Sequence, residues 1–126
     1  MRALGFVIVT MLLWLAGVAP AMAQAPDPYS KGPHLATTLI AESMTPAAGS
    51  TVTLAYDVTP QRGWHGYWQN PGDAGFPAKF DWSLPAGITA GAPLYPVPTT
   101  LIIADLMNYV FEQHYTLLVT LQIPAG

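Results

Sequence analysis

Strand-length stretches in which apolar and other residues alternate, each closed by a turn containing proline or glycine, dominate this sequence. The clearest stretch is Ser50–Val58, which places Val52, Leu54, Tyr56 and Val58 on one face. A period of two is typical of a half-buried strand, because successive side chains of a strand point to opposite faces. Residues 115–123 are predicted to form a second clear strand. These stretches restrict the chain to a β fold.

Other segments between these two are also strand-like. Leu35–Glu42, Gly63–Gln69 and Ala78–Leu84 are predicted strands. Gly91–Pro98 contains three prolines and is predicted to be an edge segment or an extended loop, because proline lacks the N–H that a central strand donates. Leu101–Phe111 fits a short helix or a strand, with its last four residues favouring a strand. About six candidate strands predict an all-β, immunoglobulin-like sandwich, incomplete at its C-terminal side because such sandwiches usually have seven or more.

The first 23 residues have the pattern of a cleavable secretory signal peptide. Arg2 precedes an apolar run over residues 3–18, and Ala21-Met22-Ala23 places small residues before the expected cleavage point. The apolar run of about 16 residues is shorter than the roughly 20 that span a bilayer, so an uncleaved anchor is the less favoured alternative. Residues 24–34, rich in proline and glycine, are expected to be a flexible lead-in, and residues 35–126 a β-sandwich domain.

Charge and cysteine content exclude several functions. The chain has 4 Lys and Arg against 7 Asp and Glu, and a net charge of −3. It has no basic patch, so nucleic acid is not an expected partner. The chain has no cysteine. It therefore forms no disulfide and offers no thiolate to a disulfide or a metal, and no cofactor is expected.

The densest group of aromatic residues lies in the run GWHGYWQNPGDAGFP over residues 63–77. Alternation places Trp64 and Trp68 on one face and His65 and Tyr67 on the other. Two interpretations remain open. In the first, the tryptophans are core residues beside a stiff corner, where the indole N–H needs a hydrogen-bond partner. In the second, the face with the histidine and the tyrosine is a binding surface.

The tetrapeptide Asn70-Pro71-Gly72-Asp73 predicts a turn that ends this strand. Proline holds φ near about −65° and glycine accepts a positive φ, which is what a type II turn requires. The Asp73 side chain is expected to cap the turn, since aspartate commonly hydrogen-bonds to the nearby backbone.

These residues resemble part of a known family. The run over residues 63–77 is similar to the GWH-x-YW-x-NPGD-x-G-x-P stretch in the periplasmic N-terminal domain of DsbD-like thiol:disulfide interchange proteins, and most similar to the suppressor-of-copper-sensitivity (ScsB) type. Residues 80–87, 94–98 and 108–112 resemble, in turn, the next strand with its LP-x-G turn, the W/Y-P-x-P segment and the N-Y-G-Y-E motif of that domain. Leu117-Leu118-Val119 matches the strand that follows. The resemblance covers residues 37–126.

The resemblance implies an immunoglobulin-like sandwich with a redox-active cysteine pair. That pair relays electrons from a membrane-embedded redox domain of the same parent protein to periplasmic thiol proteins. In the family it lies after the N-Y-x-x-E strand, and this chain has no cysteine there or elsewhere. We therefore expect a domain truncated before the cysteine pair, located in the periplasm, not catalytic alone and at most a scaffold or docking domain. The resemblance also implies links to cytochrome c biogenesis and copper tolerance.

No residue inherits a catalytic role from this resemblance. The residues expected to shape a binding surface or its supporting corner belong to the two motifs. They are Trp64, His65, Tyr67, Trp68, Asn70, Pro71, Gly72 and Asp73 in the first, and Asn108, Tyr109 and Glu112 in the second. Val110 stands where the family has glycine, and Gln113-His114-Tyr115 replaces its short acidic turn, so the local turn geometry is expected to differ.

A stand-alone periplasmic binding module is the alternative function. Exposed aromatic rings could stack on a sugar or an apolar peptide, and imidazole and thioether groups could hold copper. The candidate metal ligands are His34, His65, His114, Met44 and Met107. No two histidines are two or four residues apart, so their spacing does not predict a metal site.

Overall fold

A computed structural model of the chain describes residues 34–126, which form two antiparallel sheets. The strands are β1 (Leu35–Ala41), β2 (Thr51–Pro60), β3 (Gly66–Gly72), β4 (Thr89–Ala90), β5 (Thr99–Ile103), β6 (Leu106–Phe111) and β7 (Tyr115–Gln122). Their order is β1-β2-β7-β4 in one sheet and β3-β6-β5 in the other. The fold is all-β and consistent with an immunoglobulin-like sandwich, as predicted. The predicted signal peptide and all of the predicted lead-in except His34 lie outside the described residues.

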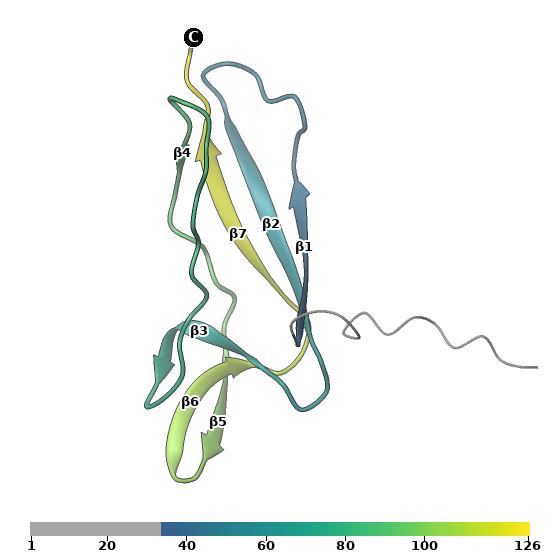
Figure 1. The fold of residues 1–126 in the computed structure, drawn as a ribbon, viewed down its shortest axis with the longest axis vertical. Helices are drawn as coiled ribbons and strands as arrows, with labels where there is room; N and C mark the ends of the chain where they lie inside the picture. Colours follow the sequence, from purple (N-terminus) through teal and green to yellow (C-terminus); the bar gives the residue numbers. More distant parts are fainter. Residues whose placement is uncertain (1–33) are drawn as a thin grey trace, which may run out of the picture.

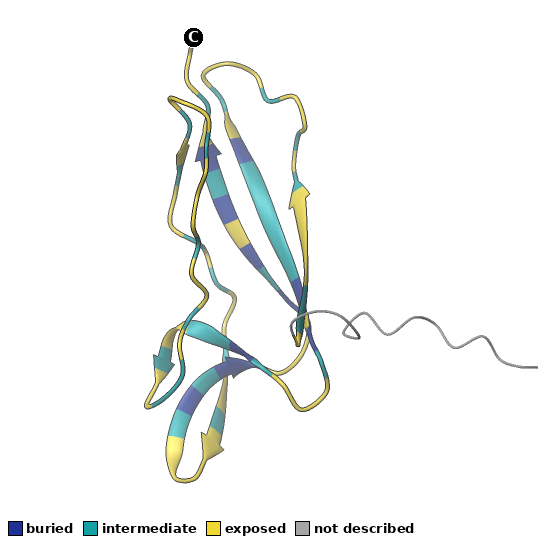
Figure 2. Cartoon of the chain, in the orientation of Figure 1, coloured by how far each residue is buried: buried dark blue, intermediate teal, exposed yellow. Residues whose placement is uncertain are grey.

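The two sheets meet near the middle of an elongated molecule (Figure 1). The core lies at this junction, where Val58, Phe111, Tyr115 and Leu117 are buried together. Figure 2 shows the buried segments on β2, β6 and β7, with exposed residues at both ends of the molecule. Among residues 34–126, no helix is long and apolar enough to cross a membrane.

The four-stranded sheet follows the predicted alternation. Val52 lies opposite Leu121 and Val58 opposite Tyr115, so the apolar faces of β2 and β7 coincide. Strands were predicted over residues 35–42, 50–58 and 115–123, and all three are confirmed, with shifts of one or two residues at their ends. Alternation identified these strands because one face of each is packed and the other is not.

The third predicted strand is displaced. Gly63 has a φ of 86°, outside the strand region, and β3 begins at Gly66. The strand then continues through the predicted turn to Gly72. Its pairing with β6 is irregular, because residues 68–71 lie opposite Tyr109 alone. Asn70 and Pro71 therefore lie in a bulge, which suits a proline that has no N–H to donate, and the strand ends at Gly72, within the predicted turn.

The strand predicted over Ala78–Leu84 is wrong. The segment is extended but pairs with no strand among the described residues. It belongs to the connection that leaves β3 in one sheet and reaches β4 in the other, and the rings of Phe80 and Trp82 contact Tyr56 of β2. Its alternation arises because the segment packs over the face of a sheet. Such packing produces the same period of two without a hydrogen-bonded neighbour.

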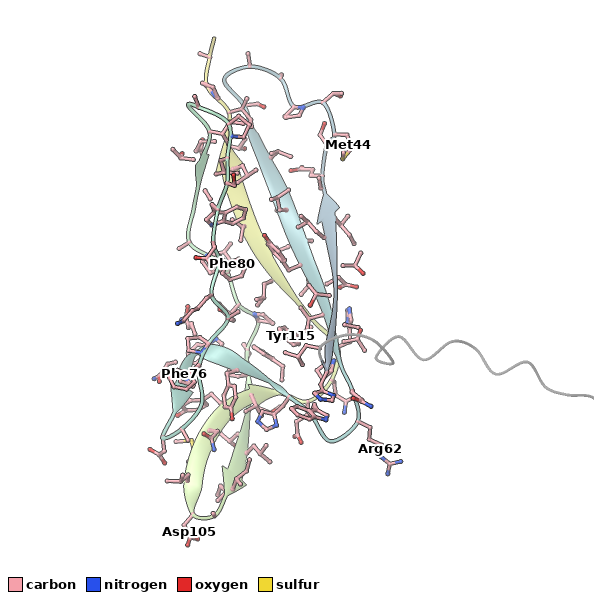
Figure 3. The ribbon with its side chains drawn as sticks, viewed as in Figure 1. Met44, Arg62, Phe76, Phe80, Asp105 and Tyr115 are labelled. Atoms are coloured by element: carbon pink, nitrogen blue, oxygen red, sulfur yellow. The ribbon has the colours of Figure 1, made fainter. Side chains whose placement is uncertain are left out.

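The two remaining predictions concern the stretch before β7. The proline-rich segment Gly91–Pro98 is an extended edge, as predicted, joined to β7 by a bridge between Leu94 and Leu118 and by a bond from the Gly91 N–H to the Thr120 carbonyl oxygen (2.8 Å). The helix alternative for residues 101–111 is wrong, because this stretch forms most of the β5–β6 hairpin. Ala104 and Asp105 at the hairpin tip both have positive φ. Asp105 lies at the end of the molecule opposite Met44 (Figure 3).

Candidate functional site

The two sequence motifs meet in space where β3 bends and β6 passes beside it. The Asp73 N–H donates to the carbonyl oxygen of Met107 (2.9 Å), and the Asp73 carboxylate accepts from the Met107 N–H (2.8 Å). These two bonds join residues 34 positions apart in the sequence. We call the group formed by Asn70, Pro71, Gly72, Asp73 and Asn108 the β3–β6 corner.

Asn108 is the buried polar centre of this corner, with 2% of its surface exposed. Its side-chain oxygen accepts from the Ala74 N–H (3.2 Å). Its side-chain nitrogen donates to the carbonyl oxygen of Leu106 (3.1 Å) and, at a longer 3.5 Å, to that of Leu101. The amide thus links the β5–β6 hairpin to the segment that follows β3. Such a buried side chain is stable only because its polar atoms are paired.

Gly72 brings the two strands into close contact. Its φ is 89°, and a Cβ at this position would collide with the carbonyl oxygen of Met107. The turn is capped by Asn70, whose side-chain oxygen accepts from the Gly72 N–H (3.2 Å). The prediction that Asp73 caps the turn is therefore wrong, because its carboxylate bonds across to β6. Together these residues form a structural corner.

The first tryptophan of the motif is not a core residue. Trp64 is 49% exposed and stacks on His34, with ring centroids 3.6 Å apart and planes at 10°. It lies in the loop between β2 and β3, before the strand begins. His65 and Tyr67 contact each other edge to face at 5.0 Å. The Tyr67 ring also covers Gly75, where a Cβ would collide with it.

The second tryptophan lines a groove. Trp68 packs against the core cluster and meets Tyr109 edge to face at 5.7 Å. Both rings border a hollow of about 570 Å³ whose other wall is the proline-rich segment before β5. Its lining residues are Trp68, Gln69, Pro93, Leu94, Tyr95, Pro96, Val97, Pro98, Thr100 and Tyr109. We call this hollow the Trp68–Tyr109 groove.

Tyr95 and the prolines of this groove were missed as site residues in the sequence. They matched the W/Y-P-x-P segment of the resemblance, and this match was the signal that could have identified them. A second hollow of about 540 Å³ shares Pro96 and Val97 with the groove and includes Glu112 and His114 in its lining. Burial raises the pKa of Tyr95 above its ordinary value.

The loop before β7 contacts the side chain of Asp57 on β2. His114 Nε2 lies 2.6 Å from a carboxylate oxygen of Asp57, and the Thr116 hydroxyl donates to the same oxygen (2.9 Å). The hydroxyl bond, followed by the His114 contact, lowers the pKa of Asp57. These contacts join the start of β7 to β2. Glu112, predicted as a site residue, is exposed on this loop, apart from the β3–β6 corner.

The three histidines among the candidate copper ligands have different partners. His34 contacts Gln61 and Trp64, His65 contacts Tyr67, and His114 contacts Asp57. Within residues 34–126, no three His, Asp or Glu residues lie close enough to hold a metal ion.

A comparison with protein families identifies the family of this chain. The family model described as "Thiol:disulfide interchange protein DsbD, N-terminal" matches residues 36–126. This chain belongs to the DsbD N-terminal domain family. The match includes both motifs, the β3–β6 corner and the Trp68–Tyr109 groove. Searches of curated proteins and of solved structures found no match.

The DsbD N-terminal family relates this chain to thiol:disulfide exchange, although the chain has no thiol with which to carry out that exchange. The family consists of periplasmic domains of thiol:disulfide interchange proteins. Exchange proceeds by attack of a thiolate on a disulfide sulfur, and this DsbD-type domain has no cysteine. Its residues can contact a partner, position it and exclude water from the contact. They cannot form a mixed disulfide.

Proposed function

We propose that this DsbD N-terminal domain is a non-catalytic docking module of a periplasmic thiol:disulfide interchange system. Residues 1–23 serve as its signal peptide and residues 35–126 as its folded domain. Its partners are the membrane-embedded redox domain of the same parent protein and periplasmic thiol proteins. The observation that carries the proposal is a family match over residues 36–126 in a chain without cysteine.

The Trp68–Tyr109 groove is the docking surface in this proposal. Trp68, Tyr95 and Tyr109 give it aromatic walls, and aromatic side chains are enriched where proteins bind one another. Val97 lies at the rim of this groove. It is 92% exposed, so its replacement should leave the core unchanged. The β3–β6 corner holds Trp68 and Tyr109 in place, because it fixes the bulge of β3 against β6. The groove therefore suits an extended apolar segment of a redox partner.

Binding to a soluble periplasmic dithiol protein tests this function. The partner is supplied with its thiols alkylated, so that contact is measured without exchange, and its affinity for the full chain is determined by calorimetry. Val97→Asp should weaken binding by about tenfold or more, as expected when a charge enters an apolar contact. Met44→Asp is the matched control, because Met44 is 87% exposed at the far end of the molecule (Figure 3).

Two results would contradict the docking function. One is the absence of binding by the unaltered chain to alkylated dithiol proteins and to the membrane-embedded redox domain. The other is an equal loss of affinity in the Val97→Asp and Met44→Asp variants, which would assign binding to net charge and not to the groove.

A further inference from the structure

Strand β1 forms an edge of the four-stranded sheet, and its own residues carry none of the usual protection against pairing. Its sequence, LATTLIA, has no charge and no proline. Within residues 34–126, β2 is the strand that pairs with it, along one side only. Natural edge strands are usually protected by charge, proline, a bulge or a covering segment. An unprotected edge over residues 35–41 is a site for another strand.

The hydrogen bonds to β2 show which backbone groups of β1 point outward. The Gln61 N–H donates to the His34 carbonyl oxygen (2.8 Å), and the Glu42 N–H donates to that of Thr53 (2.9 Å). Residues of an antiparallel strand alternate between facing the neighbour and facing away. The even-numbered residues of β1 therefore bond to β2, and Leu35, Thr37, Leu39 and Ala41 direct their N–H and C=O groups away from the sheet.

We infer that this edge is a homodimer interface, in which β1 pairs antiparallel with β1 of a second copy about a twofold axis through Thr38. This register places Leu35 opposite Ala41 of the second copy and Thr37 opposite Leu39 of the second copy. Each of these pairs joins residues whose backbone groups point outward, as a hydrogen-bonded pair requires. The full length of the strand is then paired, and one continuous sheet runs through both copies.

The side chains agree with this register. Leu39 is 55% exposed and Ile40 52% exposed, although they lie on opposite faces of β1. In the dimer Leu39 lies against Thr37 of the second copy and Ile40 against Ala36 of the second copy, so apolar surface is covered on both faces. Because β1 carries no charge, two copies meet without repulsion.

The ends of the strand bring no like charges together. In the same register, Glu42 lies across from His34 of the second copy, and the symmetry repeats this pair at the other end. Within its own copy, the Glu42 carboxylate accepts from the Thr53 N–H through one oxygen (2.9 Å), and His34 Nδ1 lies 2.7 Å from the side-chain oxygen of Gln61. Neither end places two carboxylates opposite each other, so the symmetric register pairs two copies without a like-charge contact.

Thr38 provides the sharpest test, because the axis places it opposite itself. Sedimentation of the full chain over a concentration series should show a monomer–dimer equilibrium. Thr38→Lys and Thr38→Glu should each raise the dimer dissociation constant about fivefold, since like charges directly opposite each other destabilise paired strands. An equimolar mixture of the two variants should restore dimerisation. Thr51→Lys is the matched control, because Thr51 is exposed on the same outer face but lies on the interior strand β2.

A disulfide gives a second readout that does not depend on the charged variants. The chain has no cysteine, so Thr38→Cys introduces a single thiol. Opposed residues of a non-hydrogen-bonded antiparallel pair have Cα atoms about 4.5 Å apart, within disulfide reach. Mild oxidation should convert Thr38→Cys to a covalent dimer far faster than Thr51→Cys.

Three results would overturn the interface. They are a monomeric wild type at every concentration, a dimer that Thr38→Lys and Thr51→Lys weaken equally, and cross-linking of Thr38→Cys no faster than that of Thr51→Cys.

Discussion

At the scale of single residues, Gly72 is a position that cannot take a side chain without strain. Its positive φ disfavours any residue with a Cβ, and the Met107 carbonyl oxygen occupies the space that the Cβ would need. Gly72→Ala should lower the free energy of unfolding by about 1–3 kcal/mol, measured by urea denaturation. Gly63→Ala is the control, because Gly63 has a similar φ of 86° but no atom within 4 Å of its added Cβ. Equal losses for the two variants would show that the contact with Met107 has no effect.

Asn108 is a buried residue whose two side-chain polar atoms are both hydrogen-bonded, so its replacement should lower the stability of the fold. Asn108→Leu removes the partner of the Ala74 N–H and of the Leu106 carbonyl oxygen, while keeping a similar volume in a buried place. Unpaired buried polar groups cost about 1–3 kcal/mol, so the thermal midpoint should fall clearly. Asn70→Ala breaks one exposed hydrogen bond, to the Gly72 N–H, and should cost less. A larger loss for Asn70→Ala would contradict the central role of Asn108.

These residues show what sequence could and could not provide about the site. The first motif was identified as a candidate from its proline–glycine turn among aromatic residues, and the second only from its resemblance to the N-Y-G-Y-E motif of the family. The bonds between Asp73 and Met107 could not be predicted, since local patterns do not encode which segments 34 residues apart become neighbours. Local rules also assigned the capping role to Asp73, when Asn70, three residues earlier, performs it.

At the scale of secondary-structure elements, the β5–β6 hairpin has a turn that its residues fit poorly. Ala104 and Asp105 have φ values of 49° and 65°, and a two-residue turn with both values positive prefers Asn-Gly. The double variant Ala104→Asn, Asp105→Gly should therefore raise the unfolding free energy by about 1 kcal/mol, measured by urea denaturation. A reversed Gly-Asn order at the same positions should gain less, and a loss of stability in the Asn-Gly variant would contradict the turn assignment.

The same hairpin explains one error of the sequence-based prediction. Ala-Asp is not a recognised hairpin signal, so residues 101–111 remained open between helix and strand. Alternation identified β2 and β7 because each has one packed face. It also predicted a strand over Ala78–Leu84, because a segment packed on a sheet shows the same period whether or not it is hydrogen-bonded.

At the scale of the whole molecule, the two sheets are held together by a small aromatic core. Tyr115 of β7 stacks on Phe111 of β6, with centroids 4.3 Å apart, and the Tyr95 ring also stacks on Phe111, with centroids 6.5 Å apart. The Tyr115 hydroxyl packs so closely on Gly66 of β3 that a Cβ there would collide with it. Tyr115, from the four-stranded sheet, thus touches β3 and β6, the two longer strands of the three-stranded sheet. Figure 3 shows Tyr115 at this junction.

This position makes the fold sensitive to alkaline pH. Burial, and to a smaller extent the neighbouring Tyr95, raises the pKa of Tyr115 above its ordinary value of 10.0. The neutral phenol is therefore favoured in the folded state, and the resulting stability is fully present below pH 10.0 and is lost as pH rises through the folded pKa. In Tyr115→Phe no proton is released at this site, so the midpoint of alkaline unfolding should move to higher pH.

Trp68 packs against the same core cluster, so tryptophan fluorescence between about pH 8 and 12 can follow the transition. Tyr95→Phe should produce a smaller shift, because Tyr95 is only partly buried. At neutral pH, Tyr115→Phe should stay within about 1 kcal/mol of the wild type, since it removes one oxygen atom and keeps the ring stack. If wild type and Tyr115→Phe unfold at the same alkaline pH, ionisation of this phenol does not limit the stability of the junction.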